Sequence, residues 1–221
     1  NKDVEGTTRE TKTSETFLML YNFPSNFVFW TKVKDHEQLK KKLLPQIYSN
    51  ESEITYDGVY EDSVTNYFEE KNILLDMEKE IYHNVVWDPF NEMLEDPNLN
   101  IVHRPQESKL QSMWYNVYRD GKCWHKTHTH PSSTFSGIYL LHLEGENGTV
   151  FYQSGHQLFE MNYNTKNNVE GEVIIFPSSL PHSVVSFGTH KVSISFNIMS
   201  RNEKYGNCLL YTSDAADEAD G

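Results

Sequence analysis

Apolar residues in the first half of the chain recur at the spacing of amphipathic helices. The first such segment follows Asp35, a good N-cap residue, and its apolar positions share one helical face: Leu39, Leu43, Leu44 and Ile47. Pro45 would kink or end this helix. A second segment runs from about Asp62 to Leu94, and Pro89 would divide it into two helices. The pattern therefore predicts a helical annex over about residues 35–95.

The pattern changes after about Ser108, where short runs rich in β-branched and aromatic residues begin. Gly, Asn, Ser and Pro separate six or seven such runs, which favours a sandwich or barrel. Residues 17–30 add one or two strand-like stretches around Pro24. We predict an α+β fold in which helices precede an antiparallel double-stranded β-helix, or jelly roll, over about residues 110–200. The runs are QSMWYNVYR, TFSGIYLLHL, GTVFYQ, HQLFEMNY, EVIIFP, HSVVSFG and KVSISFNIM.

The composition supports one globular unit. The 221 residues are 37% apolar and 13% aromatic, which is enough to build a hydrophobic core. We expect a single domain over residues 16–207, and the polar residues 1–15 before it are expected to be disordered.

The last fourteen residues, CLLYTSDAADEADG, do not continue the strand pattern. Their first part resembles the translation of a sequencing-library adapter, so we expect a non-native tail over residues 208–221. A disordered acidic tail is the alternative. The formal net charge of −13 includes only four acidic residues from this stretch, so the chain is acidic under either interpretation.

The acidic charge limits the partners that the chain would attract. Nucleic-acid backbones and anionic membrane surfaces would be repelled, so we expect neither as a partner. No apolar run approaches the ~18 residues that a transmembrane helix needs. With only Cys123 and Cys208, a disulfide framework is not expected, and a reducing, cytoplasmic location is the default.

Histidines stand at the ends of two predicted strands. His128 and His130 are two residues apart, so within a strand both side chains would point to one face. Imidazole is a common ligand of divalent transition metals, but a pair at this spacing is often incidental. A third histidine, His182, begins a strand 52 residues after His130. That spacing is expected if the second and seventh strands of one small barrel bring their ends together.

A lysine and a serine follow on the last strand-like run. Lys191 lies nine residues after His182, and Ser193 would face the same side two residues later. A barrel interior rarely holds a lysine without an anionic partner, and a bound carboxylate would supply one. The alternative places Lys191 at a turn, where its ammonium reaches water.

Three blocks of sequence together resemble the iron(II)/2-oxoglutarate-dependent oxygenase superfamily. They are HTHPSSTFSGIYLL, GEVIIFPSSLPH and KVSISFN, and they stand in the order and at the spacings of that superfamily. The similarity extends from about Met113 to Asn197, and more narrowly it is to oxygenases common in marine bacterial and phage sequences. The resemblance implies an iron(II) dioxygenase that couples decarboxylation of 2-oxoglutarate to hydroxylation by O₂ of a primary substrate that the sequence does not identify.

The resemblance also implies roles for individual residues. His128 and His182 would be metal ligands, and His130 stands where the superfamily usually has Asp or Glu. Lys191 stands where an arginine is usual, and Ser193 matches the hydroxyl that binds the far carboxylate of 2-oxoglutarate. Three neutral histidines would leave the site with a charge of about +2, which the dianionic cosubstrate would still neutralise. A lysine keeps the positive charge of arginine but loses its two-pronged hydrogen bonding.

Other side chains near these blocks are weaker candidates. Asn116 and Tyr118 are expected to line the pocket and touch the cosubstrate, and Tyr139 to reach the pocket from the next strand. Trp114 is expected to pack in the core. His125 is either a contact beside the site or an exposed loop residue. The remaining histidines of this half are expected at strand edges or on the surface: His142, His156 and His190.

Two further functions are compatible with the same residues. Three histidines also form metal sites in cupin-type enzymes that use no 2-oxoglutarate, although the glutamate of the cupin pattern is absent from PSSTFSG. A non-enzymatic jelly-roll binding module is the other possibility, and there the histidines would pack or hold a structural metal.

Overall fold

The computed structural model describes residues 26–49, 60–61, 63–67, 81–99, 107–119, 122–145, 148–153, 159–160, 168–187 and 190–201. The predictions of a disordered start over residues 1–15 and of a non-native tail over residues 208–221 lie outside these ranges. Among the helices in the described ranges, none is long and apolar enough to cross a membrane.

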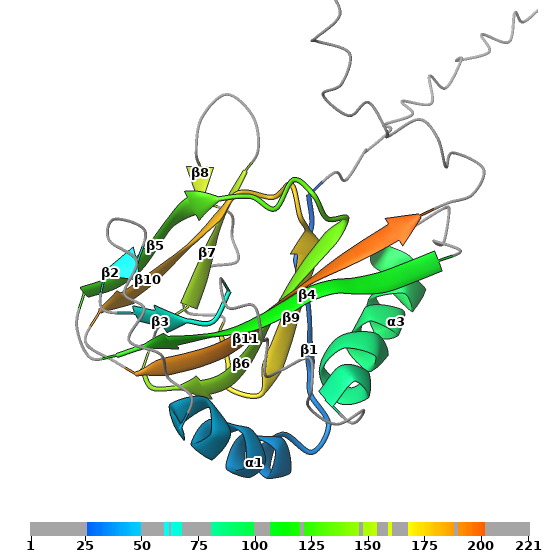
Figure 1. The fold of residues 1–221 in the computed structure, drawn as a ribbon. Coiled ribbons are helices and arrows are strands. Elements are labelled where there is room, and N and C mark those ends of the chain that lie inside the picture. The colour runs from blue at the N-terminus through cyan, green and yellow to red at the C-terminus, as the bar shows by residue number, and fades with distance from the viewer. Residues whose placement is uncertain are drawn as a thin grey trace, which may run out of the picture.

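Two antiparallel sheets form the body of the molecule (Figure 1). The first has the strand order β1 (Phe29–Lys32), β9 (Glu172–Pro177), β6 (Phe135–Leu143), β11 (Lys191–Arg201), β4 (Glu107–Tyr118) and β3 (Ser63–Thr65). The second has the order β2 (Tyr60–Glu61), β5 (Lys122–His128), β10 (His182–Phe187), β7 (Gly148–Gln153) and β8 (Phe159–Glu160). Neighbours in each sheet are mostly distant in sequence, which is the arrangement of a double-stranded β-helix.

Helix α1 (His36–Ser49) forms where the apolar spacing predicts it. Its buried residues are Leu39, Leu43 and Ile47. Pro45 lies inside the helix, which continues to Ser49, so of the two predicted effects of this proline, a kink or the end of the helix, the second does not occur. Proline removes one backbone donor there, and burial of the apolar face offsets that loss.

The second predicted helical segment is only partly helical over its described residues, 63–67 and 81–94, and the rest of it lies outside the described ranges. A π-helical turn (Tyr82–Trp87) leads into helix α3 (Asp88–Glu95), and a 3-10 turn (Pro97–Leu99) follows. Pro89 lies in the first turn of α3, where proline is tolerated because it lacks only an N–H that would be unpaired anyway. Residues 63–65 form strand β3, which pairs with β4. This pairing overrides the helical spacing of the apolar residues that we used for the prediction.

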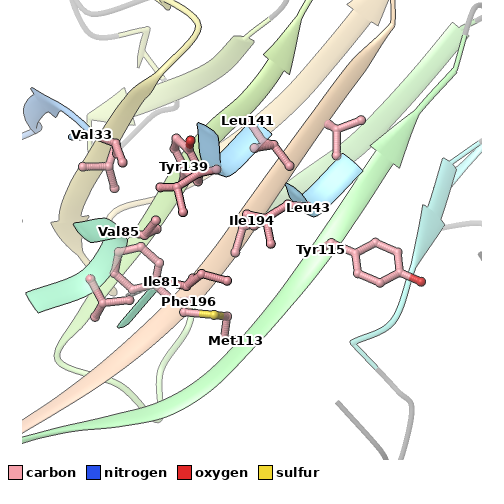
Figure 2. Close-up of a cluster of buried hydrophobic side chains, with 14 of the residues drawn as sticks. Val33, Leu43, Ile81, Val85, Met113, Tyr115, Tyr139, Leu141, Ile194 and Phe196 are labelled. Atoms are coloured by element: carbon pink, nitrogen blue, oxygen red, sulfur yellow. The ribbon is translucent and has the colours of Figure 1, made fainter. Parts of the chain in front are cut away.

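The six-stranded sheet is covered on both faces. Helices α1 and α3 lie against its outer face (Figure 1), where the larger core cluster includes Leu43, Tyr139 and Phe196 (Figure 2). A smaller cluster between the two sheets contains Ile138 and Leu140, the neighbours of Tyr139 in β6. Alternate residues of β6 therefore enter different cores, which explains why its sequence is apolar throughout.

Candidate metal centre and cosubstrate pocket

The ends of two neighbouring strands bring two histidines together. His128 is the last residue of β5, His182 is the first of β10, and the two are direct partners in the antiparallel pairing. Their ring centroids are 4.2 Å apart. The register shifts just after this pair, between His182 and Val184. Strand pairing therefore sets the separation of these two side chains.

His130 joins them from outside the strand. It lies two residues beyond the end of β5, so the strand alternation that we used to place it beside His128 does not apply. Its backbone N–H donates to the carbonyl of Ser178 (2.8 Å), and its ring Nδ1 lies 2.7 Å from Oδ1 of Asn197. The turn after β9 and the last strand thus position His130.

All three imidazoles present the same ring nitrogen to an oxygen acceptor. Nδ1 of His128 lies 2.8 Å from the carbonyl oxygen of Lys126, and Nδ1 of His182 lies 3.1 Å from that of Leu180. For His130 the oxygen acceptor beside Nδ1 is Oδ1 of Asn197. An Nδ1–H that donates to oxygen leaves Nε2 with its lone pair, which is the tautomer that binds metals through Nε2.

Burial keeps these imidazoles neutral. Desolvation lowers the pKa of His128 to about 4, lowers that of His130, and holds that of His182 well below its usual range. Neutral imidazole is the form that ligates metals, so little proton displacement is needed near neutral pH. One ligand atom from each of the three residues lies within 4.8 Å of the others. Among the described residues, no carboxylate belongs to this group.

A narrow pocket extends from the histidines into the space between the sheets. Its lining includes Asn116, Thr149, Lys191 and Ser193, all buried. The Lys191 side chain is fully buried, which excludes the alternative that its ammonium reaches water. Its Nζ, the Oδ1 of Asn116 and the Oγ1 of Thr149 have no hydrogen-bond partner within the described part of the chain. Two of these atoms, Nζ of Lys191 and Oγ1 of Thr149, are donors that fit an anionic ligand, whereas Oδ1 of Asn116 accepts hydrogen bonds only.

Of the two tyrosines predicted to touch the cosubstrate, one lines the narrow pocket and the other does not. The ring of Tyr118 lines the pocket, with its centroid 5.4 Å from Nζ of Lys191. Tyr139 faces the opposite side of the sheet, where its hydroxyl lies 2.7 Å from Nδ1 of His36 in helix α1. The prediction that Tyr139 reaches the pocket is therefore wrong, because its position in β6 points outward while its neighbour Ile138 points inward.

Burial without a partner also changes the charge of Lys191. Desolvation lowers the pKa of its ammonium to about 7. A carboxylate bound beside the ammonium would favour the charged form and reverse this effect. The aromatic face of Tyr118 lies within the range of a weak cation–π contact.

The structure adds contacts that the sequence did not reveal. Asn197 accepts from Ser136 Oγ (2.8 Å) and donates through Nδ2 to Ser112 Oγ (3.1 Å), which fixes its Oδ1 toward His130. Asn197 is the last residue of KVSISFN, four residues after Ser193, and therefore lies on the same face of β11. The alternation along this strand could have identified Asn197 as a residue of the site. His125 stacks on His128 with ring centroids 3.9 Å apart.

A larger cavity of about 550 Å³ opens beside the three histidines. His128, His130 and Asn197 form its inner side, and Tyr67 and Trp114 are its aromatic residues, with ring centroids 4.9 Å apart. The remaining lining residues are Gln111, Ser112, His125, Thr129, Pro131, Ser132 and Ser133. Within the described residues this lining holds no Asp, Glu, Lys or Arg. Trp114 thus has a place beside the site and not only in the core.

Comparisons with known proteins bear on the family resemblance and on the fold. Residues 112–197 match the family described as "Putative 2OG-Fe(II) oxygenase". A prolyl-4-hydroxylase from Pseudomonas putida aligns over 80% of this chain and 95% of its own, with a TM-score of 0.52 and 9% identity. HygX from Streptomyces hygroscopicus, solved with nickel, 2-oxoglutarate and hygromycin B, aligns over 80% of this chain and 84% of its own (TM-score 0.53, 11% identity). No curated protein matches the sequence. The two likenesses confirm the predicted double-stranded β-helix.

Proposed function

We propose that this chain is a 2OG-Fe(II) oxygenase, as its match over residues 112–197 and its fold support, and that it binds iron(II) through His128, His130 and His182. In each of the three imidazoles Nδ1 lies beside an oxygen acceptor, so Nε2 keeps its lone pair for a metal. This observation supports the three histidines as the ligands. Imidazole suits iron(II) as well as zinc. When bound, iron(II) supplies the chemistry that couples decarboxylation of 2-oxoglutarate to hydroxylation of a substrate by O₂.

The narrow pocket would hold 2-oxoglutarate. Lys191 would pair its ammonium with the far carboxylate, and the hydroxyl of Ser193 and the second N–H of the Asn116 amide would donate further hydrogen bonds. A charge-assisted hydrogen bond contributes about 1.5–3 kcal/mol. The burial of Lys191 without a carboxylate partner is the observation that carries this assignment.

The charge of the site suits the cosubstrate. With three neutral ligands the metal keeps its charge of about +2, whereas one carboxylate ligand would reduce it to about +1. A dianionic cosubstrate neutralises that charge, and Lys191 provides one additional positive charge at the far end of the pocket. The ligand set that departs from the superfamily pattern is thus compatible with 2-oxoglutarate.

The larger cavity would receive the primary substrate. Its described lining is aromatic and neutral-polar, so we propose that it takes an uncharged group that packs on Trp114 and Tyr67. The two similar structures are a prolyl hydroxylase and a protein bound to hygromycin B. Proteins of this fold therefore differ in what they bind, and the identity of the substrate must come from the cavity itself.

The variant Lys191→Ala tests whether the protein uses 2-oxoglutarate or has a three-histidine metal site that does not need this cosubstrate. Anaerobic addition of iron(II) and 2-oxoglutarate to the unmodified protein should give a weak visible charge-transfer band. In Lys191→Ala the 2-oxoglutarate concentration for half of this band should rise about 10- to 100-fold, because a charge-assisted hydrogen bond is lost. Iron(II) binding, measured by equilibrium dialysis, should be unchanged.

Lys109→Ala is the matched control, because Lys109 lies on β4 with its side chain 73% exposed and should leave the titration unchanged. Lys191→Arg should retain part of the affinity. Absence of the band from the unmodified protein would favour a cupin-type enzyme that uses no 2-oxoglutarate, and equal titrations of Lys191→Ala and the unmodified protein would show that Lys191 does not hold the far carboxylate. Absence of metal from all the proteins would favour the non-enzymatic module.

A further inference from the structure

A second group of metal-ligating side chains lies on the other side of the six-stranded sheet. His142 is near the end of β6, Glu144 follows that strand, and His190 comes just before β11. One ligand atom from each residue lies within 4.8 Å of the others. We propose that His142, Glu144 and His190 form a second divalent-metal site, separate from the three histidines in the barrel and independent of the oxygenase function.

The hydrogen-bond geometry of His142 supports a cation at this place. Its Nδ1 lies 3.1 Å from Oε2 of Glu170, and its Nε2 lies 3.2 Å from Oε1 of Glu144. A neutral imidazole has a single N–H, so it satisfies only one of two carboxylate oxygens. If Nδ1–H donates to Glu170, a metal ion between Nε2 and Glu144 satisfies both remaining atoms. Carboxylate–histidine–metal arrangements of this kind are common around protein-bound metals.

The spacing of these atoms suits small transition metals. Tetrahedral ligands held at metal distances of about 2.0–2.1 Å lie roughly 3.3 Å from one another. The Nε2 of His142 and the Oε1 of Glu144 are 3.2 Å apart. The rings of His142 and His190 are nearly perpendicular, at 88°, with centroids 5.3 Å apart, and Nε2 of His190 lies 3.3 Å from the hydroxyl of Tyr48.

The backbone already holds the three residues in one place. The N–H of Glu144 donates to the carbonyl oxygen of His190 (2.9 Å), and His142 is paired with Val192 across the two strands. The side chain of His142 is 19% exposed and that of Glu144 is 57% exposed, so an ion from solvent can reach the site without opening the core. Two imidazoles and a carboxylate, with water in the remaining positions, suit Zn²⁺ or Co²⁺.

A neighbouring group shows what excludes a metal. His36, Glu37 and Glu170 also have ligand atoms within 4.8 Å of one another. There, however, the ammonium of Lys40 is hydrogen-bonded to the same Oε1 of Glu170 that faces His36. A positive charge already occupies that carboxylate oxygen and would repel a metal ion. We therefore assign the metal to the His142 group alone.

The test counts Zn²⁺ bound to the full chain by equilibrium dialysis. The unmodified protein should bind two equivalents. His142→Ala with His190→Ala should bind one, and His128→Ala with His182→Ala should bind one at the other site. With Co²⁺ in place of Zn²⁺, the His128→Ala/His182→Ala protein should show visible absorption of a nitrogen- and oxygen-ligated ion, which His142→Ala/His190→Ala should remove from that background.

Single substitutions of exposed carboxylates test the same site with less risk that the protein fails to fold. Glu144→Gln in the His128→Ala/His182→Ala background should weaken Zn²⁺ binding at least 10-fold, because the amide is a poor substitute for the carboxylate. Glu37→Gln, in the neighbouring group, should leave it unchanged. Absence of bound Zn²⁺ from the His128→Ala/His182→Ala protein, or equal affinity after Glu144→Gln in that background, overturns the proposal. Neither result bears on the proposed function, because two of the inner histidines are already absent from that background.

Discussion

Among the acceptors that orient the three inner imidazoles, only that of His130 is a side chain. Backbone carbonyls hold His128 and His182, and these contacts survive any substitution that preserves the backbone. The Oδ1 of Asn197 holds His130. The neighbouring hydroxyls of Ser112 and Ser136 fix the orientation of the Asn197 amide. His130, the proposed ligand that departs from the superfamily pattern, is thus also the one whose orientation depends on a replaceable residue.

Asn197→Ala should weaken metal binding by about 10- to 100-fold, because residues that orient a metal-bound histidine typically have effects of this size. The measurement is a competition titration of Zn²⁺ or Ni²⁺ against a chelator, in a protein that also carries His190→Ala so that only the inner site is counted.

Asn197→Asp keeps an oxygen acceptor for His130 and should retain most of the metal affinity. An Asn197→Ala protein with unchanged affinity would show that His130 is oriented by its backbone contact with Ser178 alone, or that it is not a ligand.

The sequence identified the residue types of the site better than their geometry. His128, His182 and Lys191 follow from the order and spacing of strands, and the structure brings them to one pocket. His130 was placed beside His128 by an alternation that does not hold, since it lies in a turn. Tyr139 could not be assigned to a face from its sequence, because both faces of β6 are buried and both carry apolar residues.

Strand β6 is the element on which the packing of the sheet depends most closely. Gly137 is paired with Phe196 of β11, and a Cβ atom at residue 137 would lie 2.0 Å from Cζ of the Phe196 ring. That ring is fully buried in the core between the sheet and the helices. The absence of a side chain at residue 137 therefore creates the space that the ring fills.

Gly137→Ala should destabilise the fold by about 1–3 kcal/mol, the usual cost of adding a methyl group to a filled core. The measurement is urea unfolding of the metal-free protein.

Phe196→Leu should reduce this cost, because the shorter side chain leaves room for the new methyl group. A Gly137→Ala protein as stable as the original would mean that the Phe196 ring moves aside without penalty. If the losses in Gly137→Ala, Phe196→Leu and the double variant were additive, these two residues would not be in steric conflict.

Elements with a simple period were predicted well and others were not. Helix α1 and strands β4, β6, β7, β9, β10 and β11 have the positions that apolar spacing indicates. Residues 63–65 were not predicted as a strand. A short edge strand is stabilised by its partner strand, here β4, which is distant in sequence and so does not affect the local apolar pattern. Strand β5 was also missed as a separate run, since KCWHKTH is mostly polar and its histidines serve the site.

At the scale of the whole molecule, Glu170 joins the helical layer to the barrel. Its carboxylate contacts Lys40 and His36 of helix α1, and it accepts from the backbone N–H of Leu143 (2.7 Å) at the end of β6. Burial raises the pKa of this carboxyl, but the hydrogen bonds from Lys40 and Leu143 outweigh it and lower the pKa to about 2. The carboxylate is thus strongly preferred in the folded protein.

Glu170→Gln should therefore destabilise the metal-free protein by about 1–3 kcal/mol near neutral pH, the range for hydrogen bonds to a charged group. The folded-state pKa is about 2 and the ordinary value is 4.5, so the carboxylate contributes fully above about pH 4.5. That contribution is lost as the pH falls toward 2. Urea unfolding of the two proteins from neutral pH to about pH 3 should show their difference shrinking.

Glu144→Gln is a useful control for this experiment, because the Glu144 side chain is 57% exposed and its carboxylate is ion-paired with His142 of β6. It should change the free energy of unfolding by less than about 0.5 kcal/mol. A constant difference between Glu170→Gln and the unmodified protein at every pH would show that the charge of Glu170 is not what secures helix α1.

The direct pairing of His128 with His182 bears on how a chain of this kind can diversify. The two side chains are held by contact between strand ends and not by the length of chain that separates them. Connections within that length can gain or lose residues over generations while the pair keeps its place. The rim of the barrel can thus change while the two histidines are inherited in the same relative position.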